Sequence, residues 1–408
     1  MRRSMIPILI PILVFAASAG AQNADTLNRV VAPPGSDLGL PFSAGVLSGD
    51  FLFLSGAIGN QPGTTKVQGD AAAQLRQTLD NLGRVLAAAE MDFSRVVEAN
   101  LYLSDLRFVD STIQQIFVER FQADRRPALT TVQADIAIPG AVTEISMIAA
   151  RPGVEIRRIS PEGWPTPPRY SWGLLAGDTV FVSGMASFDP KTGETVSGDA
   201  RAQTARTMKN VGAVLEAAGL GFGNVVSCRV FLADTRDYGA MNEVYPTFFP
   251  AAPPARATVR AHLIRPEWKV EVQCTAVKGR DRRAVLPPGA EPRAILSPAI
   301  QVGERLFLSG MVGRGPDGFL PDVSAQTDIV LERLAATLAA AGMSFRDVRD
   351  ATVFLSDIRY YAAMNEVYRQ VVGSPPPARA TVGLQLMTPD ALVEIQMTAS
   401  KPAEPASE

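Results

Sequence analysis

The chain has 408 residues, of which 47% are hydrophobic and 20% charged, and its formal net charge is −2. This length suits several globular domains, and a near-neutral chain without a basic, aromatic-rich stripe is a poor match for a nucleic-acid partner. The single histidine, His262, leaves almost no material for a zinc site or a histidine-based triad, so we expect neither a metal nor a cofactor. The two cysteines, Cys228 and Cys274, lie in apolar, strand-like sequence, and we interpret them as buried thiols rather than a disulfide.

The first residues differ from the rest of the chain. Two arginines precede an apolar run at residues 6–17, and Ala-Gly-Ala at residues 19–21 has the pattern of a cleavage site. We interpret residues 1–21 as a secretory signal peptide and expect the mature protein to be periplasmic and outside the membrane. The alternative is an N-terminal membrane anchor, which a short run interrupted by two prolines disfavours.

The remainder of the chain repeats itself three times. The segment FLFLSGAIG at residues 51–59 recurs as TVFVSGMAS at 179–187 and as RLFLSGMVG at 305–313. Repeats of this length are whole domains rather than the short units of a solenoid. We predict domain 1 at residues 30–152, domain 2 at residues 158–278 and domain 3 at residues 285–402.

Each domain has the same order of predicted elements, and domain 2 illustrates it. Two short strands end at a Ser-Gly pair, and a helix, a strand at residues 225–232 and a second helix at residues 238–249 follow. A proline-rich loop ends the second helix, and the last two strands, 257–263 and 269–277, are predicted to form a hairpin. This ββαβαββ order predicts an α+β fold, with a mixed sheet and both helices on one of its faces.

The face of each sheet without helices also needs cover, because the strands carry apolar residues on both sides. Residues 225–232 illustrate this with a nearly continuous apolar run. We therefore expect the three linked domains to pack these faces around a pseudo-threefold axis. The protein would then be a monomer that imitates a trimer.

An arginine and a glutamate are the main candidates for chemistry. Arg256 and Arg379 open the predicted last hairpins, and Glu271 and Glu394 follow fifteen residues later. We therefore expect each arginine to lie nearly opposite the glutamate of its own domain. A guanidinium group suits a substrate carboxylate, and a glutamate can place a water or move a proton. A structural cross-strand ion pair explains the same spacing at least as well.

Several other residues accompany this pair. Domain 1 keeps Glu144 but has Leu129 at the arginine position, so its site is expected to be altered. The threonines two residues after the arginines point to the same face of the strand as the arginines do, as hydroxyl donors or as ordinary strand residues. The remaining candidates for substrate binding are these threonines, the serine after the second strand, one tyrosine and the asparagines of the second helix: Thr258, Thr381, Ser183, Ser309, Tyr170, Asn242 and Asn365.

Taken together, these segments resemble the RidA family, also called YjgF/YER057c/UK114, of reactive-intermediate (enamine/imine) deaminases. The resemblance runs from about residue 30 to residue 402. It rests on the SG pair, NVGAVLEAAG, VFLADTRDYGAMNEVY, and PPARATV with a glutamate fifteen residues later. It implies a chorismate-mutase-like fold and the clefts between subunits of a trimer, without showing which domain completes which cleft.

The resemblance also implies roles. In the family an arginine grips the carboxylate of a 2-imino acid, and a glutamate with backbone groups places the water that attacks the C=N bond. The matching residues are Arg256 and Arg379 for the arginine, Glu271, Glu394 and Glu144 for the glutamate, and Tyr170 and Ser183 for a family tyrosine and serine.

We expect a deaminase of small 2-imino or enamine acids, with Glu271 and Glu394 catalytic and domain 2 the most complete. The alternative is a non-catalytic module that binds a small carboxylate or a protein. An endoribonuclease activity, which has been attached to the family, is disfavoured by the charge, the lone histidine and the expected export.

Overall fold

The computed structural model describes residues 28–36, 38–108, 111–121, 123–279 and 281–401. The predicted signal peptide, residues 1–21, lies outside the described residues. In the part that is described, no helix is both long and apolar enough to cross a bilayer.

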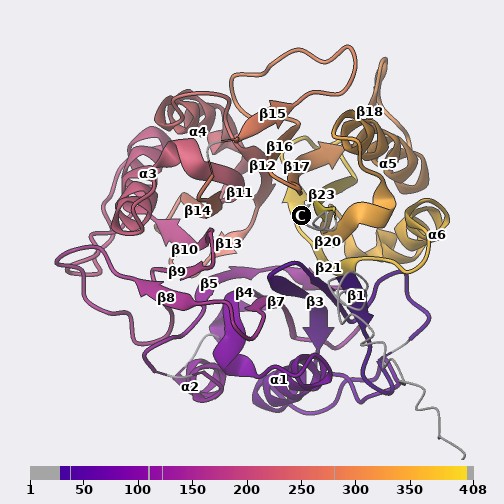
Figure 1. Ribbon diagram of the computed structural model, residues 1–408, viewed down its shortest axis with the longest axis horizontal. Helices are drawn as coiled ribbons and strands as arrows, with labels where there is room; N and C mark the ends of the chain where they lie inside the picture. The colour runs from indigo at the N-terminus through magenta and orange to yellow at the C-terminus, as the bar shows by residue number, and fades with distance from the viewer. Residues whose placement is uncertain (1–27, 37, 109–110, 122, 280, 402–408) are drawn as a thin grey trace, which may run out of the picture.

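The three predicted domains build three similar units around a common centre, with their helices on the outside (Figure 1). Domain 1 contains β1 (Asn28–Val31), β2 (Gly45–Ser48), β3 (Phe51–Ile58), α1 (Ala71–Ala88), β4 (Val96–Leu103), α2 (Ser111–Glu119), β5 (Ala128–Gln133), β6 (Asp135–Ile136) and β7 (Thr143–Ala150). Domain 2 contains β8 (Ile156–Ile159), β9 (Gly173–Ala176), β10 (Thr179–Ala186), α3 (Ala200–Ala217), β11 (Val225–Leu232), α4 (Tyr238–Val244), β12 (Ala255–Arg260), β13 (His262–Leu263) and β14 (Val270–Val277).

Domain 3 repeats this series with one additional small hairpin. It contains β15 (Arg283–Val285), β16 (Ala299–Val302), β17 (Arg305–Val312), β18 (Arg314–Gly315), β19 (Gly318–Phe319), α5 (Val323–Ala340), β20 (Val348–Leu355), α6 (Tyr361–Val372), β21 (Ala378–Gly383), β22 (Gln385–Leu386) and β23 (Val393–Ser400). Short 3-10 helices lie at Phe93–Arg95, Leu106–Phe108, Phe222–Asn224, Thr235–Asp237, Tyr245–Phe248, Phe345–Asp347 and Ile358–Tyr360. Each long helix begins at an aspartate, Asp70, Asp199 or Asp322, whose side chain accepts a hydrogen bond from a first-turn amide.

Each sheet is mixed, as predicted, but its strand order corrects the expected hairpin. In domain 2 the order is β22-β12-β11-β14-β10-β9-β8, so β11 lies between β12 and β14. Strand β12 runs parallel to β11 because the chain returns through α4, and only β14 is antiparallel to β11. The prediction that the last two strands pair with each other is therefore wrong, and Arg256 on β12 is not opposite Glu271 on β14.

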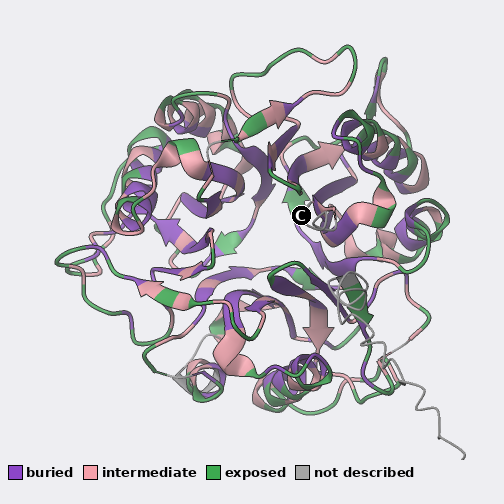
Figure 2. Cartoon of the chain, in the orientation of Figure 1, coloured by how far each residue is buried: buried purple, intermediate pink, exposed green. Residues whose placement is uncertain are grey.

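The three sheets are linked into a ring by short strands that join a neighbouring domain. Strand β13 of domain 2 pairs with β5 of domain 1, β22 of domain 3 pairs with β12 of domain 2, and β6 of domain 1 pairs with β21 of domain 3. An apolar cluster drawn from all three domains, which includes Tyr102, Phe231 and Phe354, fills the space between them. Figure 2 shows that the strands near the centre are mostly buried while the outer helices carry the exposed residues. The pseudo-threefold arrangement is the one expected from the apolar strands.

The two cysteines form a disulfide rather than two thiols. Cys228 on β11 and Cys274 on β14 are directly opposite each other across the antiparallel pair, with their Cα atoms 4.2 Å apart. The interpretation of separate buried thiols is therefore wrong. It failed because the sequence spacing of the cysteines says nothing about the register of two strands that meet only in the folded sheet.

Candidate functional site between domains

A Ser-Gly pair interrupts the third strand of every domain, β3, β10 or β17, and meets the neighbouring domain there. The regular pairing of β10 with β14 shifts between Val182 and Met185, so Ser183 and Gly184 form a bulge, and β3 and β17 have the same irregularity. Strands β5, β12 and β21 pack against these bulges from the preceding domain. We name the three contacts junctions 1/2, 2/3 and 3/1 after the domains that meet there.

The serine hydroxyl at each bulge connects two domains. Ser309 donates to the carbonyl oxygen of Ser297 at 2.6 Å and accepts the backbone N–H of Arg256 at 2.8 Å. Ser55 accepts from Arg379 at 2.7 Å in the same way, and Ser183 accepts from the amide of Leu129 at 2.9 Å. Because each hydroxyl donates its hydrogen bond within its own domain, we assign Ser183 and Ser309 to holding the neighbouring strands β5 and β12 in register. They were predicted to bind substrate.

The glycine of each bulge makes room for a glutamate. A Cβ at Gly56 would lie 2.0 Å from Oε1 of Glu144, and one at Gly310 would lie 1.9 Å from Oε1 of Glu394. Only glycine leaves that space, and the carboxyl group of the glutamate occupies it.

Each glutamate faces the arginine strand of the preceding domain. Oε1 of Glu394 accepts the amide of Thr258 at 3.4 Å, and Oε1 of Glu144 accepts the amide of Thr381 at 3.1 Å. Arg256 and Glu394 therefore belong to junction 2/3, and Arg379 and Glu144 to junction 3/1. The expected pairing within one domain is wrong, because β11 and its equivalents separate the two strands.

Glu144 is the site residue that the sequence reasoning left out of the catalytic set. Its own domain carries Leu129 in place of an arginine, but the strand that Glu144 faces belongs to domain 3 and carries Arg379. Glu271, by contrast, lies at junction 1/2, where Ser183 holds the strand that carries Leu129. Domain 2 is therefore not a complete site on its own, and its glutamate faces a position that has no arginine.

Both arginines are buried without an acidic partner. Arg256 is 1% exposed and Arg379 is 2% exposed, and in the described part of the chain neither forms an ion pair. Nη2 of Arg256 donates to Oδ1 of Asn242 at 2.8 Å, and Nη2 of Arg379 donates to Oδ1 of Asn365 at 2.6 Å. The asparagines, predicted as substrate ligands, thus contact the arginines and position them.

Several donors of the two guanidinium groups have no partner. These are Nε of Arg256 and both Nε and Nη1 of Arg379. Tyrosine rings lie against each guanidinium, Tyr245 at 4.9 Å and Tyr368 at 4.7 Å, which stabilises the positive charge without supplying an acceptor. A buried cation with unpaired donors suits an anionic ligand, since burial of an unpaired charge is costly.

Burial also changes the carboxyl groups at the junctions. Burial raises the pKa of Glu144 to about 7 and that of Glu394 to about 8, while a backbone N–H bond and the nearby arginine act in the opposite direction. Burial alone raises the pKa of Glu271 to about 8, which agrees with the missing arginine at junction 1/2. Groups with such pKa values gain and lose protons near neutral pH, as acid–base catalysts do.

The threonines that follow the arginines lie beside the glutamates of the next domain. The hydroxyl oxygens of Thr258 and Thr381 are buried and have no hydrogen-bond partner. Each is therefore free to bond to a substrate or a water at its junction.

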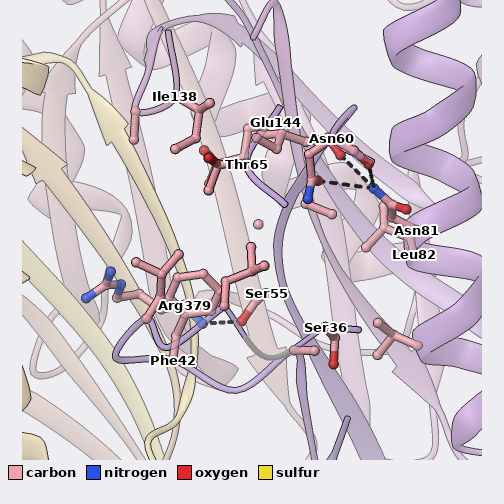
Figure 3. Close-up of a pocket in the computed structure, with 18 of the residues that line it drawn as sticks. Ser36, Phe42, Ser55, Asn60, Thr65, Asn81, Leu82, Ile138, Glu144 and Arg379 are labelled. Atoms are coloured by element: carbon pink, nitrogen blue, oxygen red, sulfur yellow. Dashed lines mark hydrogen bonds between the residues drawn. The ribbon is translucent and has the colours of Figure 1, made fainter. Parts of the chain in front are cut away.

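A pocket of about 130 Å³ opens at junction 3/1. Arg379 and Thr381 line it from domain 3, and Ser55, Gly56 and Glu144 line it from domain 1 (Figure 3). The guanidinium group of Arg379 points away from Glu144 in this view, toward domain 3. The rest of the lining is largely apolar and includes Leu38, Leu40, Phe42, Ile58, Leu82, Val85, Ile136 and Ile138.

Junction 1/2 has a different, aromatic character. Tyr170 lies there, edge-on to Trp172 at 5.3 Å, and Trp164 and Phe188 also pack on Trp172. Burial raises the pKa of the Tyr170 phenol, and the negative charge of Glu271 adds to this. The structure thus places the predicted substrate ligand Tyr170 beside Glu271 and apart from both arginines.

All three domains match one known protein family. The family model described as Endoribonuclease L-PSP matches the chain three times, over residues 37–151, 165–278 and 289–401. Protein DfrA of Myxococcus xanthus is 48% identical over 102 residues, which are 25% of this chain and 78% of that protein. The 2-iminobutanoate/2-iminopropanoate deaminase of Rattus norvegicus is 38% identical over 110 residues, 27% of this chain and 80% of that protein.

A solved structure extends the likeness beyond one domain. The crystal structure of a chorismatase aligns with 76% of this chain and 94% of its own, with a TM-score of 0.52. Its sequence identity is 15%, so the likeness concerns the fold alone.

Proposed function

Because the chain belongs to the RidA family in all three of its domains, we propose that it is a hydrolytic deaminase of 2-imino acids that works at junctions 2/3 and 3/1. The observation that carries the proposal is the same at both junctions. A buried arginine without an acidic partner lies on one domain, and a buried glutamate of raised pKa lies on the next. The name of the rat relative, an imino-acid deaminase, supports this reaction.

The arginine would bind the substrate carboxylate. Arg379 has two guanidinium nitrogens without a partner, Nε and Nη1, and either of them forms a fork of two parallel N–H groups for a carboxylate together with Nη2, which Asn365 holds. Since the guanidinium points toward domain 3, we propose that the side chain turns toward Glu144 as the carboxylate binds. Asn365 then holds the guanidinium when the site is free and releases it to the substrate.

The glutamate would move the proton of the attacking water. In its ionised form Glu144 accepts a proton as the water oxygen bonds to the imine carbon, and it passes that proton to the imine nitrogen. The C=N double bond becomes a single bond in this step. The hydroxyl proton of the resulting carbinolamine then passes to the amino nitrogen, the C–N bond breaks, and ammonia and a 2-keto acid leave. Thr381, with its unpaired hydroxyl, is placed to hold the water or the departing nitrogen.

The pocket at junction 3/1 favours an apolar substrate side chain. Leucine, isoleucine, valine and phenylalanine side chains from both domains line it beside the arginine and the glutamate. We propose that imino acids with apolar side chains larger than a methyl group are preferred there, because they remove more apolar surface from water.

We also propose that the protein works outside the cytoplasm. Residues 1–21 have the pattern of a secretory signal, and the Cys228–Cys274 disulfide supports an oxidising compartment. Fractionation of cells that express the full-length chain tests this. The protein should be released with the periplasm and lack residues 1–21, whereas uncleaved protein in the cytoplasm would contradict the proposal.

The reaction itself is tested with a freshly generated 2-imino acid. An amino-acid oxidase produces the imine from leucine or from alanine, and the release of ammonia and keto acid is followed with and without the protein. Acceleration, larger for the leucine-derived imine, is expected. No acceleration with either imine, together with thermal stabilisation by carboxylic acids, would instead identify a binding module.

A further inference from the structure

A second cavity, of about 70 Å³, lies where the inner faces of the three sheets meet. All three domains line it, and it is separate from the arginine–glutamate junctions. Equivalent positions on the central strands carry different residues: Glu98 of β4 corresponds to Ser227 of β11 and Asp350 of β20. A trimer of identical chains would repeat one residue three times here, whereas this single chain combines three different ones.

Two arginines and two carboxyl groups line this cavity, and Arg305 is paired with Asp178 at 2.6 Å. Arg229 of β11 donates from Nε to Oε1 of Gln396 at 2.9 Å and from Nη2 to Oγ1 of Thr352 at 3.0 Å. These bonds hold the guanidinium on side chains of domain 3. In the described part of the chain, neither Glu98 nor Asp350 forms an ion pair with it.

One buried acceptor of this cavity lacks a donor. Glu98 is 4% exposed, and a 3.3 Å bond from Nδ2 of Asn100 reaches its Oε1. Gln273 is 3% exposed and donates to Oδ1 of Asn100 at 2.9 Å, but its own Oε1 has no hydrogen-bond partner. The missing group is therefore a hydrogen-bond donor.

The charge balance of the cavity points the same way. Since Asp178 balances Arg305, the two carboxylates in their ionised form and the guanidinium of Arg229 leave one negative charge. Burial raises the pKa of both Glu98 and Asp350, with the charge of Arg229 opposing it, and a further cation would favour the ionised form of both. A monovalent cation completes this arrangement better than a divalent ion, since Arg229 already supplies one positive charge.

The walls and size of the cavity restrict what that cation is. Phe53, Phe181 and Phe307, at equivalent positions of β3, β10 and β17, line it together with Ile148 and Met397. Aromatic rings attract cations and also cover short apolar groups. A volume of about 70 Å³ holds only a few non-hydrogen atoms.

We propose that the central cavity binds a short primary alkylammonium ion, whose N–H groups bond to Glu98, Asp350 and the free amide oxygen of Gln273 while its alkyl group lies on the three phenylalanines. This site does not depend on the deaminase proposal, because it shares no residue with the two junctions.

Calorimetric titration of the mature chain with ethylammonium chloride tests this site. Saturable binding of one ethylammonium per chain is expected, with no heat from sodium chloride at the same ionic strength. Tetramethylammonium, a cation without N–H groups, should bind much more weakly. Ammonium chloride separates the contribution of the alkyl group, and it should bind more weakly than ethylammonium.

Two variants locate the binding. Glu98→Gln and Asp350→Asn should each weaken ethylammonium binding by about tenfold or more, since hydrogen bonds to charged groups are among the stronger ones. Glu144→Gln, a matched change of a buried carboxyl group at junction 3/1, should leave binding unchanged. Both cavity variants should fold with an unchanged or higher melting temperature, because each removes a buried carboxyl group that has no ion-pair partner. Absence of saturable binding, equal affinity in the two cavity variants and wild type, or loss of binding in Glu144→Gln would overturn the proposal.

Discussion

Replacement of both buried arginines by leucine, the residue that domain 1 already carries at Leu129, should abolish deamination without unfolding the protein. Each guanidinium would form two charge-assisted hydrogen bonds to a substrate carboxylate once its Nη2 leaves the asparagine that holds it, Asn242 or Asn365. Such bonds contribute about 1.5–3 kcal/mol each, and 1.4 kcal/mol corresponds to about tenfold. The double variant Arg256→Leu/Arg379→Leu should therefore lose at least about a hundredfold in kcat/KM.

The stability of this double variant should change little. Leucine removes a buried charge that has no acidic partner, which is neutral or stabilising. It also leaves Oδ1 of Asn242 or Asn365 without its donor, which costs about 1–3 kcal/mol. Because these effects oppose each other, the melting temperature should stay near that of the wild type.

The assay is keto-acid release from the leucine-derived imine, measured beside a melting curve for every variant. Arg359→Leu is the matched control, since Arg359 is 86% exposed and pairs only with Asp357, and it should behave as wild type. Each single arginine variant should retain the activity of the other junction. A folded double variant that deaminates at the wild-type rate would refute the role of the arginines.

Three further predictions concern other parts of the molecule. Mass spectrometry of the unreduced protein should find the peptides of Cys228 and Cys274 linked, and two freely alkylated thiols would contradict the observed pairing. Glu271→Gln should raise the melting temperature at pH 8 but not at pH 4. Folding raises the pKa of Glu271 from 4.5 to about 8, so the wild type loses stability as the pH rises across that interval. The loss is on the order of a few kcal/mol. An equal shift at both pH values would disprove this cause. In Arg256→Leu, whose activity depends on junction 3/1, the deamination rate should rise with pH through about 7, the pKa of Glu144, and a rate that falls over this range would exclude the carboxylate as the base.

The repeat and the order of elements were predictable because they depend on local patterns. Strand 225–232 was predicted with the bounds that β11 has, and the apolar residues on both of its faces correctly indicated that three sheets pack together. The second helix is shorter than residues 238–249, since α4 ends at Val244 and continues as a 3-10 helix to Phe248.

The composition of the sites was not predictable, because it depends on which strands become neighbours. A spacing of fifteen residues between Arg256 and Glu271 fits a hairpin, but a parallel crossover through α4 inserts β11 between them. The contact between Arg256 and Ser309 spans 53 residues, and that between Arg379 and Ser55 spans 324. A useful signal was present: Glu144 is retained in a domain that lacks its own arginine.

The central claim, that each site joins two domains, is tested most directly by combining variants. In the Arg256→Leu background only junction 3/1 remains, so adding Glu394→Gln should cost nothing further, while adding Glu144→Gln should remove the remaining activity. In the Arg379→Leu background the two glutamate variants should exchange these effects. If Glu271→Gln is instead silent in the Arg256→Leu background and Glu394→Gln removes the activity, the arginine and glutamate of one domain act together and the account is wrong.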